Sequence, residues 1–157
     1  MTYRYLIIFT IFLVLFPAGC SYRFVDPFPV YEYALVSVRN STAETGLAVL
    51  LEEEMRKIGG FKDRSANRLS VTVTGFTETV ESVSSDGFPV RQKLTINVSW
   101  KVEGKQPAQA VFGSDTTSRT YPYSTNLPTL DWYRSAAVRL LTETAASRIL
   151  AGLGEQP

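Results

Sequence analysis

The sequence contains no histidine and only one cysteine, Cys20. The absence of histidine removes the most common general base and the most common metal ligand of proteins. A single cysteine allows neither an intrachain disulfide nor a cluster of thiolates around a metal ion. Ser-His-Asp and Cys-His catalytic arrangements are therefore excluded. Enzymes built on carboxylates, Lys or Tyr stay possible, but we expect a protein without catalytic activity, metal or cofactor.

Neither sign of charge is in marked excess, because the sequence has 16 Lys and Arg residues and 15 Asp and Glu residues, for a net charge of +1. Nucleic-acid-binding proteins neutralise phosphates with a surplus of Lys and Arg. The sequence therefore predicts no nucleic-acid partner, and no global field that would draw the whole protein to an anionic surface.

One long apolar run is present, from Tyr5 to Phe16, and it follows Arg4 and the free amino group. A short apolar run after a positive start, ending in small residues, is typical of a secretory signal peptide. A transmembrane helix would need about 20 apolar residues, and Pro17 ends this run early. A buried core helix fits less well, because the run is apolar on every side.

Cys20 could be a core residue, a reactive thiol or a point of attachment. The sequence Ala18-Gly19-Cys20 resembles the bacterial lipobox, with Pro17 where that motif usually has leucine. The resemblance implies diacylation of the Cys20 sulfur, cleavage before Cys20 and acylation of the new amine, and several acyl chains make release from a membrane slow. We therefore predict a signal peptide over 1–19 and a lipidated tether over 20–32. Under the sorting rule for such lipoproteins, Ser21 favours the outer membrane.

The first half of the remaining chain predicts a strand, a helix and a second strand. Alternation over 33–40 indicates a strand with Ala34, Val36 and Val38 on one face. Ser41 to Glu44 matches a capping box. The helix behind it has one apolar stripe, closed by Gly59-Gly60: Leu47, Leu50, Leu51, Met55 and Ile58. Glu52, Glu53 and Glu54 point in three directions, which favours a solvated face over a metal site.

A threonine-rich strand follows, with alternate Leu69, Val71 and Val73 and an expected bulge at Gly75. Asp86-Gly87 then predicts a hairpin turn. The next strand alternates most clearly, and its apolar face comprises Val90, Leu94, Ile96, Val98, Trp100 and Val102. One apolar and one polar face indicate an antiparallel sheet that is covered on one side.

A fourth strand is expected over about 109–119, and a long helix begins with Thr129 as N-cap and extends to Leu150. Its apolar side comprises Ala137, Val138, Leu141, Ala145 and Ile149. The order β-α-β-β-β-α predicts an α+β fold, a two-layer sandwich in which two helices cover one face of a four-stranded, mainly antiparallel sheet. We assign it to a single domain over 33–153.

This layout resembles the LPS-assembly lipoproteins of the LptE family. The resemblance rests on the order of elements and on short phrases: Tyr22 and Phe24 after the cysteine, Arg39-Asn40 after the first strand, and Ser85-Asp86-Gly87 in the hairpin. It implies a non-enzyme that occupies the lumen of a large outer-membrane β-barrel, LptD. The family helps this barrel to assemble and assists the delivery of lipopolysaccharide to the outer leaflet.

The family is also described as binding lipopolysaccharide through basic residues at one end of the sheet, and our candidates are Arg91 and Lys93. Two positions apart on a strand, they point to the same polar face, and together could hold the phosphates of a lipid A headgroup. Lys101, farther along this face, is a third candidate. The alternative is that these charges only keep an open sheet face soluble.

Two other functions stay open. One is a lipid-anchored periplasmic binding or scaffold domain of another envelope assembly machine. The other is a carboxylate-based hydrolase, which needs two acidic side chains in one cleft. The acidic residues of this sequence are scattered, and we therefore disfavour a hydrolase.

Overall fold

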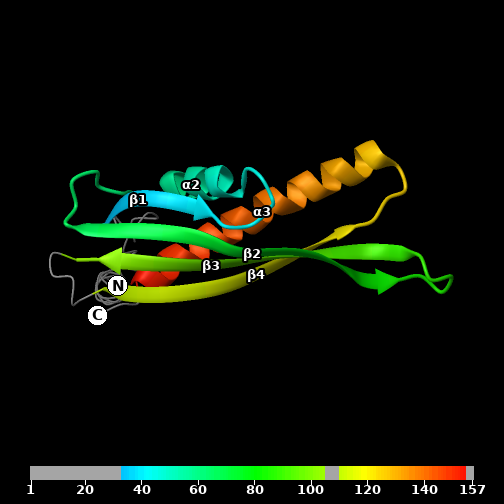
Figure 1. Ribbon diagram of the computed structural model, residues 1–157. Helices are drawn as coiled ribbons and strands as arrows, with labels where there is room; N and C mark the ends of the chain where they lie inside the picture. Colours follow the sequence, from blue (N-terminus) through cyan, green and yellow to red (C-terminus); the bar gives the residue numbers. More distant parts are fainter. Residues whose placement is uncertain (1–32, 105–109, 155–157) are drawn as a thin grey trace, which may run out of the picture.

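The computed structural model describes residues 33–104 and 110–154 (Figure 1). Its elements are β1 (Tyr33–Asn40), α2 (Leu47–Ile58), β2 (Asn67–Val83), β3 (Pro89–Glu103), β4 (Val111–Pro122) and α3 (Leu127–Gly154). The predicted signal peptide and tether, including Cys20, lie outside the described residues, as do 105–109. Within the described part of the chain, no helix combines the length and apolarity needed to span a membrane.

The four strands form one sheet in the order β1-β2-β3-β4. β1 and β2 run parallel and are connected by α2, whereas β2–β3 and β3–β4 are antiparallel. Figure 1 views the sheet from its uncovered side, with α3 behind the strands. The predicted α+β fold, its element order and its mainly antiparallel sheet are confirmed.

The core lies between the sheet and the two helices. The helix stripes predicted from the sequence pack into this layer, with Leu51, Met55 and Leu141 fully inaccessible and Leu50 and Ile58 partly buried. The alternating positions of β2 and β3 complete this layer, with Leu69, Val71, Val73, Leu94 and Ile96 also inaccessible. Burial of this apolar surface is the main term that favours the folded state.

β1 differs from the prediction, because a β-bulge between Leu35 and Ser37 changes the phase of its side chains. Leu35 is buried and Val38 packs against the core, whereas Val36 is 44% exposed. The expected face of Ala34, Val36 and Val38 is therefore wrong. A bulge inserts one unpaired residue into a strand, so the residues on either side of it lose their regular alternation.

The segment before α2 also differs, since Ser41 to Glu44 does not cap the helix. The helix begins at Leu47, after Gly46 with φ of 84°. The Asn40 side chain organises this turn instead: its oxygen accepts hydrogen bonds from the Thr42 amide and hydroxyl at 2.9 and 2.7 Å. Ser41 donates to the Val73 carbonyl at 2.7 Å. The residues that resembled a helix cap therefore form hydrogen bonds at the end of β1 and do not cap α2.

The acidic run of α2 is solvated only in part. Glu52 is paired with Arg56 at 3.0 Å on the helix surface, as expected of a solvated face. Glu54 is buried, with its carboxylate 3.4 Å from the ammonium group of Lys57. The prediction that all three glutamates are solvated is therefore wrong for Glu54.

α3 is longer than predicted at both ends. Its first turn is capped by Asn126, whose side-chain oxygen accepts a hydrogen bond from the amide of Thr129 at 3.3 Å. Thr129 is thus inside the helix and is not its N-cap. Pro128 fits this first turn because amides there have no partner within the helix.

β2 and β3 form a long hairpin that extends beyond the helical layer (Figure 1). The turn is closed by Gly87, with φ of 81°, whose amide donates to the Ser84 carbonyl at 3.0 Å. The predicted bulge at Gly75 is confirmed by a register shift between Val73 and Gly75. Val90, expected in the core, is 45% exposed because it lies in this projecting part.

Candidate functional site: the open face of the sheet

The side of the sheet opposite the helices, which we call the open face, is lined by short polar side chains. The strand register places Ser99 between Thr72 of β2 and Ser114 of β4, and Thr95 between Thr77 and Ser118. On β3 the outward positions between the cations Lys93 and Lys101 are Thr95, Asn97 and Ser99, and none is charged. The centre of the open face is thus polar but carries no charge on β3.

Asn97 organises the centre of the open face. Its side-chain oxygen accepts a hydrogen bond from the Thr116 hydroxyl at 2.9 Å, and its backbone carbonyl accepts one from the Thr74 hydroxyl at 3.3 Å. The Asn97 side chain also lies directly over Gly75, where a Cβ atom would be 2.7 Å from its amide nitrogen. The glycine at the β2 bulge therefore makes room for this asparagine.

Arg91 and Lys93 both lie on the open face, as predicted, close to the β2–β3 turn. Arg91 is opposite Ser82 and Lys93 is opposite Thr79. Within the described part of the chain neither forms an ion pair. Their side chains are about 7 Å apart along the strand, which allows both to contact one anionic group.

A polar network on the opposite side of the sheet holds the strand segment that carries Arg91 and Lys93. Between them, Gln92 points inward, and its side-chain oxygen is 2.6 Å from the Tyr121 hydroxyl. Tyr121 also donates a hydrogen bond to the Glu78 carboxylate. The pKa of Tyr121 is raised, first by its burial and then by this hydrogen bond to Glu78. The inward side chains thus fix the direction of their outward neighbours.

Lys101 lies on the same face but not at the same place, because the ten residues that separate it from Arg91 span about 33 Å of strand. Its ammonium group is 2.5 Å from the Glu103 carboxylate and 5.5 Å from the centre of the Phe112 ring. The hydrogen bond from Lys101 holds the pKa of Glu103 below its usual value. Lys101 therefore cannot share one small ligand with Arg91 and Lys93.

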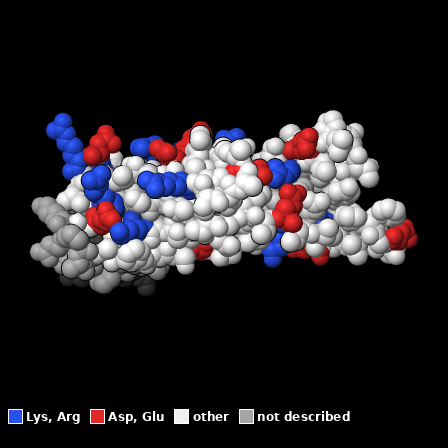
Figure 2. Space-filling view, in the orientation of Figure 1, with Lys and Arg blue, Asp and Glu red and all other residues white. Residues whose placement is uncertain are grey.

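The structure places Lys101 in a second basic cluster that the sequence analysis missed. Arg68 is opposite Glu103, and Arg39 is beside Thr72, both on exposed outward positions. Figure 2 shows Lys and Arg side chains gathered at this end of the molecule. We call Arg39, Arg68, Lys101 and Glu103 the basic end. The alternation of β2 could have placed Arg68 there, but Arg39 follows the unpredicted bulge.

A hollow of about 320 Å³ lies on the open face beside Lys101. Ser70, Thr72 and Ser99 line it together with Lys101 and Phe112, whose ring is 68% exposed. The hollow thus combines hydroxyl groups with one cation and two aromatic residues, Phe112 and Trp100.

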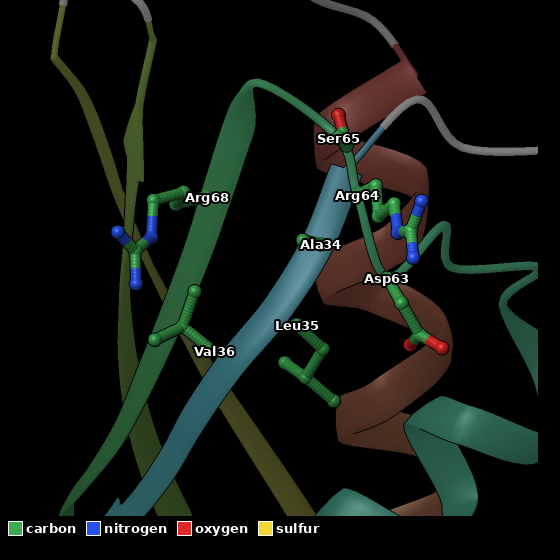
Figure 3. Close-up of a pocket in the computed structure, with 7 residues that line it drawn as sticks. All are labelled: Ala34, Leu35, Val36, Asp63, Arg64, Ser65 and Arg68. Carbon is green, nitrogen blue, oxygen red and sulfur yellow. The ribbon is translucent and has the colours of Figure 1, made fainter.

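A second hollow, of about 400 Å³, lies beside β1 and is lined by Ala34, Leu35, Val36, Asp63, Arg64, Ser65 and Arg68. Figure 3 shows that Arg68 and Val36 point to one side of β1, whereas Asp63 and Arg64 lie on the other side. Binding sites for small molecules combine an apolar pocket with convergent polar groups. The two arginines diverge, so this hollow does not have the geometry of such a site.

No group of three metal-binding side chains occurs in residues 33–104 and 110–154. Two acidic residues from different segments, Glu44 and Glu78, are both paired with Arg134 of α3, at 2.9 and 3.0 Å. These contacts raise the pKa of Arg134, mainly through the hydrogen bonds to Glu44. Both carboxylates are therefore engaged in joining structural elements.

Three solved structures share this fold at low sequence identity. They are a putative lipoprotein from Caulobacter crescentus (18% identity, 78% of this chain and 87% of the other, TM-score 0.54), rare lipoprotein B from Shewanella oneidensis (18%, 76% and 93%, 0.56), and a minor lipoprotein from Acinetobacter baumannii (16%, 82% and 100%, 0.51). At these identities the likeness extends to the fold alone. No curated protein matches the chain significantly.

A match to a protein-family sequence model is stronger evidence of relationship than these structural similarities. The family described as LptE, lipopolysaccharide-assembly, matches residues 32–153, which cover the helices and strands of the described residues except the last residue of α3. This match agrees with the family resemblance recognised in the sequence. The chain belongs to the LptE family of lipopolysaccharide-assembly lipoproteins.

Proposed function

We propose that this protein is an outer-membrane lipoprotein that occupies the lumen of the LptD β-barrel and helps that barrel to assemble. The observation that carries this proposal is the hydroxyl-rich centre of the open face, which has no charged side chain on β3 between Lys93 and Lys101. Burying a charge without a partner is costly, whereas hydroxyl groups form hydrogen bonds in many geometries. A polar surface with few charges therefore suits a protein that is enclosed by the hydrated, polar inner wall of a barrel.

In this proposal Arg91 and Lys93 contact the phosphates of lipopolysaccharide at the hairpin end of the open face. Arginine binds phosphate through two parallel hydrogen bonds, and lysine contributes a point charge. Both side chains have no ion-pair partner among the described residues and are therefore available to a ligand. Lys101 is about 27 Å from Lys93 along β3, and we assign it no part in this contact.

The proposal also includes attachment of the protein to the outer membrane through acyl chains on Cys20, and a role without catalysis. Mass spectrometry of the protein from membranes should find diacylglycerol and an additional acyl chain on a chain that begins at Cys20. The variant Cys20→Ala should carry no such lipid. A lipid that persists in this variant would contradict the attachment site.

Co-purification tests the partner. The protein, isolated from outer membranes in mild detergent, should be recovered in a stable one-to-one complex with a large β-barrel. Recovery with a different envelope protein in the same ratio would instead support a scaffold role in another assembly machine. Recovery alone, at an expression level matched to that of the barrel, would contradict the proposal.

A further inference from the structure

The basic end lies where the chain enters the domain. β1 begins at Tyr33, which is opposite Asn67, and the next residue, Arg68, is opposite Glu103 at the end of β3. Figure 1 shows β1 and β2 starting at one end of the molecule, and the β2–β3 turn at the other. Any membrane attachment in residues 1–32 is therefore connected to the domain at the basic end, and not at the hairpin. Residues 20–32 span at most about 45 Å when fully extended.

The basic end has a net positive charge on an otherwise nearly neutral chain. Three cations, Arg39, Arg68 and Lys101, face one anion, Glu103, so two positive charges are in excess on this part of the open face. On the opposite side of β1, Arg64 lies next to Asp63, so this side adds no net charge (Figure 3). The sequence alone excluded a global field, but the fold concentrates cations locally.

The directions of these side chains indicate the shape of the ligand. Arg64 and Arg68 lie on opposite sides of β1 (Figure 3), and Arg39, Arg68 and Lys101 are spread over β1, β2 and β3. Cations that diverge in this way do not converge on one small ion. An extended surface with many phosphates can contact all of them at the same time.

The position of Phe112 favours a membrane surface over other polyanions as the ligand of the basic end. Its ring is 68% exposed next to Lys101, on the edge strand of the sheet. Aromatic rings next to basic side chains are favoured at the boundary between headgroups and acyl chains. From the entry point of the chain, the local charge, the diverging arginines and this exposed ring, we propose that the basic end binds the phosphate headgroups of an anionic phospholipid surface.

In this proposal, contact between the basic end and the membrane orients the domain before it binds the barrel. Attachment at the N-terminus alone leaves the domain free to rotate, whereas a second, electrostatic contact fixes which face is turned to the membrane. Each basic side chain close to an anionic surface strengthens binding by roughly fivefold. The inference does not depend on the identity of the barrel or on the binding of lipopolysaccharide.

The experiment uses the full chain with Cys20→Ser and an uncleaved N-terminus, which we expect to stay on vesicles through the apolar run 5–16. Because Cys20 is the only cysteine, a new cysteine at Ser114, two residues from Phe112, carries a single fluorescent donor. Energy transfer to a headgroup acceptor is measured in vesicles of 70% phosphatidylethanolamine and 30% phosphatidylglycerol. Vesicles of phosphatidylcholine with the same acceptor density serve as the neutral surface.

We expect high transfer on the anionic vesicles, low transfer on the neutral ones, and loss of the difference at 1 M salt, where the screening length is about 3 Å. Arg68→Gln with Lys101→Gln should lower the equilibrium constant for contact between the domain and the vesicle surface by roughly 25-fold. Glu103→Gln, which removes the only anion of the basic end, should raise this constant by roughly fivefold.

Arg119→Gln with Arg139→Gln is the matched control, because it removes the same charge from exposed positions outside the basic end. It should leave the transfer unchanged. Equal transfer on anionic and neutral vesicles would overturn the inference, as would equal effects of the two double variants. Far-UV circular dichroism of each variant confirms that the fold is retained.

Discussion

Arg134 donates hydrogen bonds to both carboxylate oxygens of Glu44, at 2.9 and 3.2 Å, and so connects α3 to the segment between β1 and α2. The Nε atom of the same guanidinium donates to Glu78 of β2 at 3.0 Å. One side chain therefore joins three parts of the fold that are distant in sequence. All three side chains are about 30% exposed, so that solvent weakens each pair.

Arg134→Ala should destabilise the domain by about 1–2 kcal/mol, because it leaves two partly buried carboxylates close together without a cation. Denaturant unfolding measures this change. Arg139→Ala on the exposed side of α3 is the control and should change stability by less than about 0.5 kcal/mol. Equal losses in the two variants would show that the contacts of Arg134 contribute nothing specific.

Tyr121 should make the domain sensitive to alkaline pH. Its pKa is raised in the folded protein by burial and by the hydrogen bond to Glu78, so above about pH 10 the unfolded chain loses this proton first. The stability contributed by the tyrosine is complete below that pH and declines as the pH rises toward the folded pKa. Tyr121→Phe should therefore lose less stability than the natural protein between pH 9 and about 11.5 in denaturant titrations. Parallel pH profiles would contradict this prediction.

Gly113 provides the space that Trp100 occupies, because a Cβ atom at position 113 would be 2.7 Å from Cη2 of the indole and closer still to other ring atoms. Gly113→Ala should destabilise the domain by about 1–3 kcal/mol through overpacking. Gly152 of α3 faces the same indole at an ordinary 3.7 Å. Gly152→Ala should be neutral or stabilising by up to about 1 kcal/mol, and thermal unfolding of both variants separates the two outcomes.

Arg91→Glu with Lys93→Glu should weaken the binding of lipopolysaccharide to the purified protein by at least about tenfold, because both charges are reversed at one end of the open face. The melting temperature should change little, since neither side chain has an ion-pair partner among the described residues. Arg119→Glu with Arg139→Glu controls for net charge. If binding falls equally in both double variants, the two residues have no special role.

Patterns within single elements predicted most of the fold. The alternation of β2 and β3 and the stripe of α2 each arise from the burial of one face, and each is confirmed except at Val90. Local motifs failed where long-range pairing decided the structure. The β1 bulge exposes Val36, and Ser41 donates to Val73 of a neighbouring strand and does not cap α2.

The sequence predicted which side chains of β3 lie on the open face, but it did not predict which charged residues of different strands lie close together. Alternation placed Arg91, Lys93 and Lys101 on one side of β3, which the register confirms. That Arg39 and Arg68 surround Lys101 depends on the alignment of three strands and on the β1 bulge, and a single-strand pattern contains neither. The network of Glu44, Glu78 and Arg134 was missed for the same reason.

The central claim is that the open face is enclosed by a barrel, and site-specific photo-crosslinking in cells tests it directly. A photoreactive residue at Thr95, in the centre of the open face, should capture a large outer-membrane β-barrel in high yield. The same residue at Glu53, an exposed position on α2, is the matched probe of the helical layer. Capture of the barrel from position 95 well above that from position 53 is the expected result. No barrel adduct from position 95, in cells where the protein reaches the outer membrane, would contradict the account.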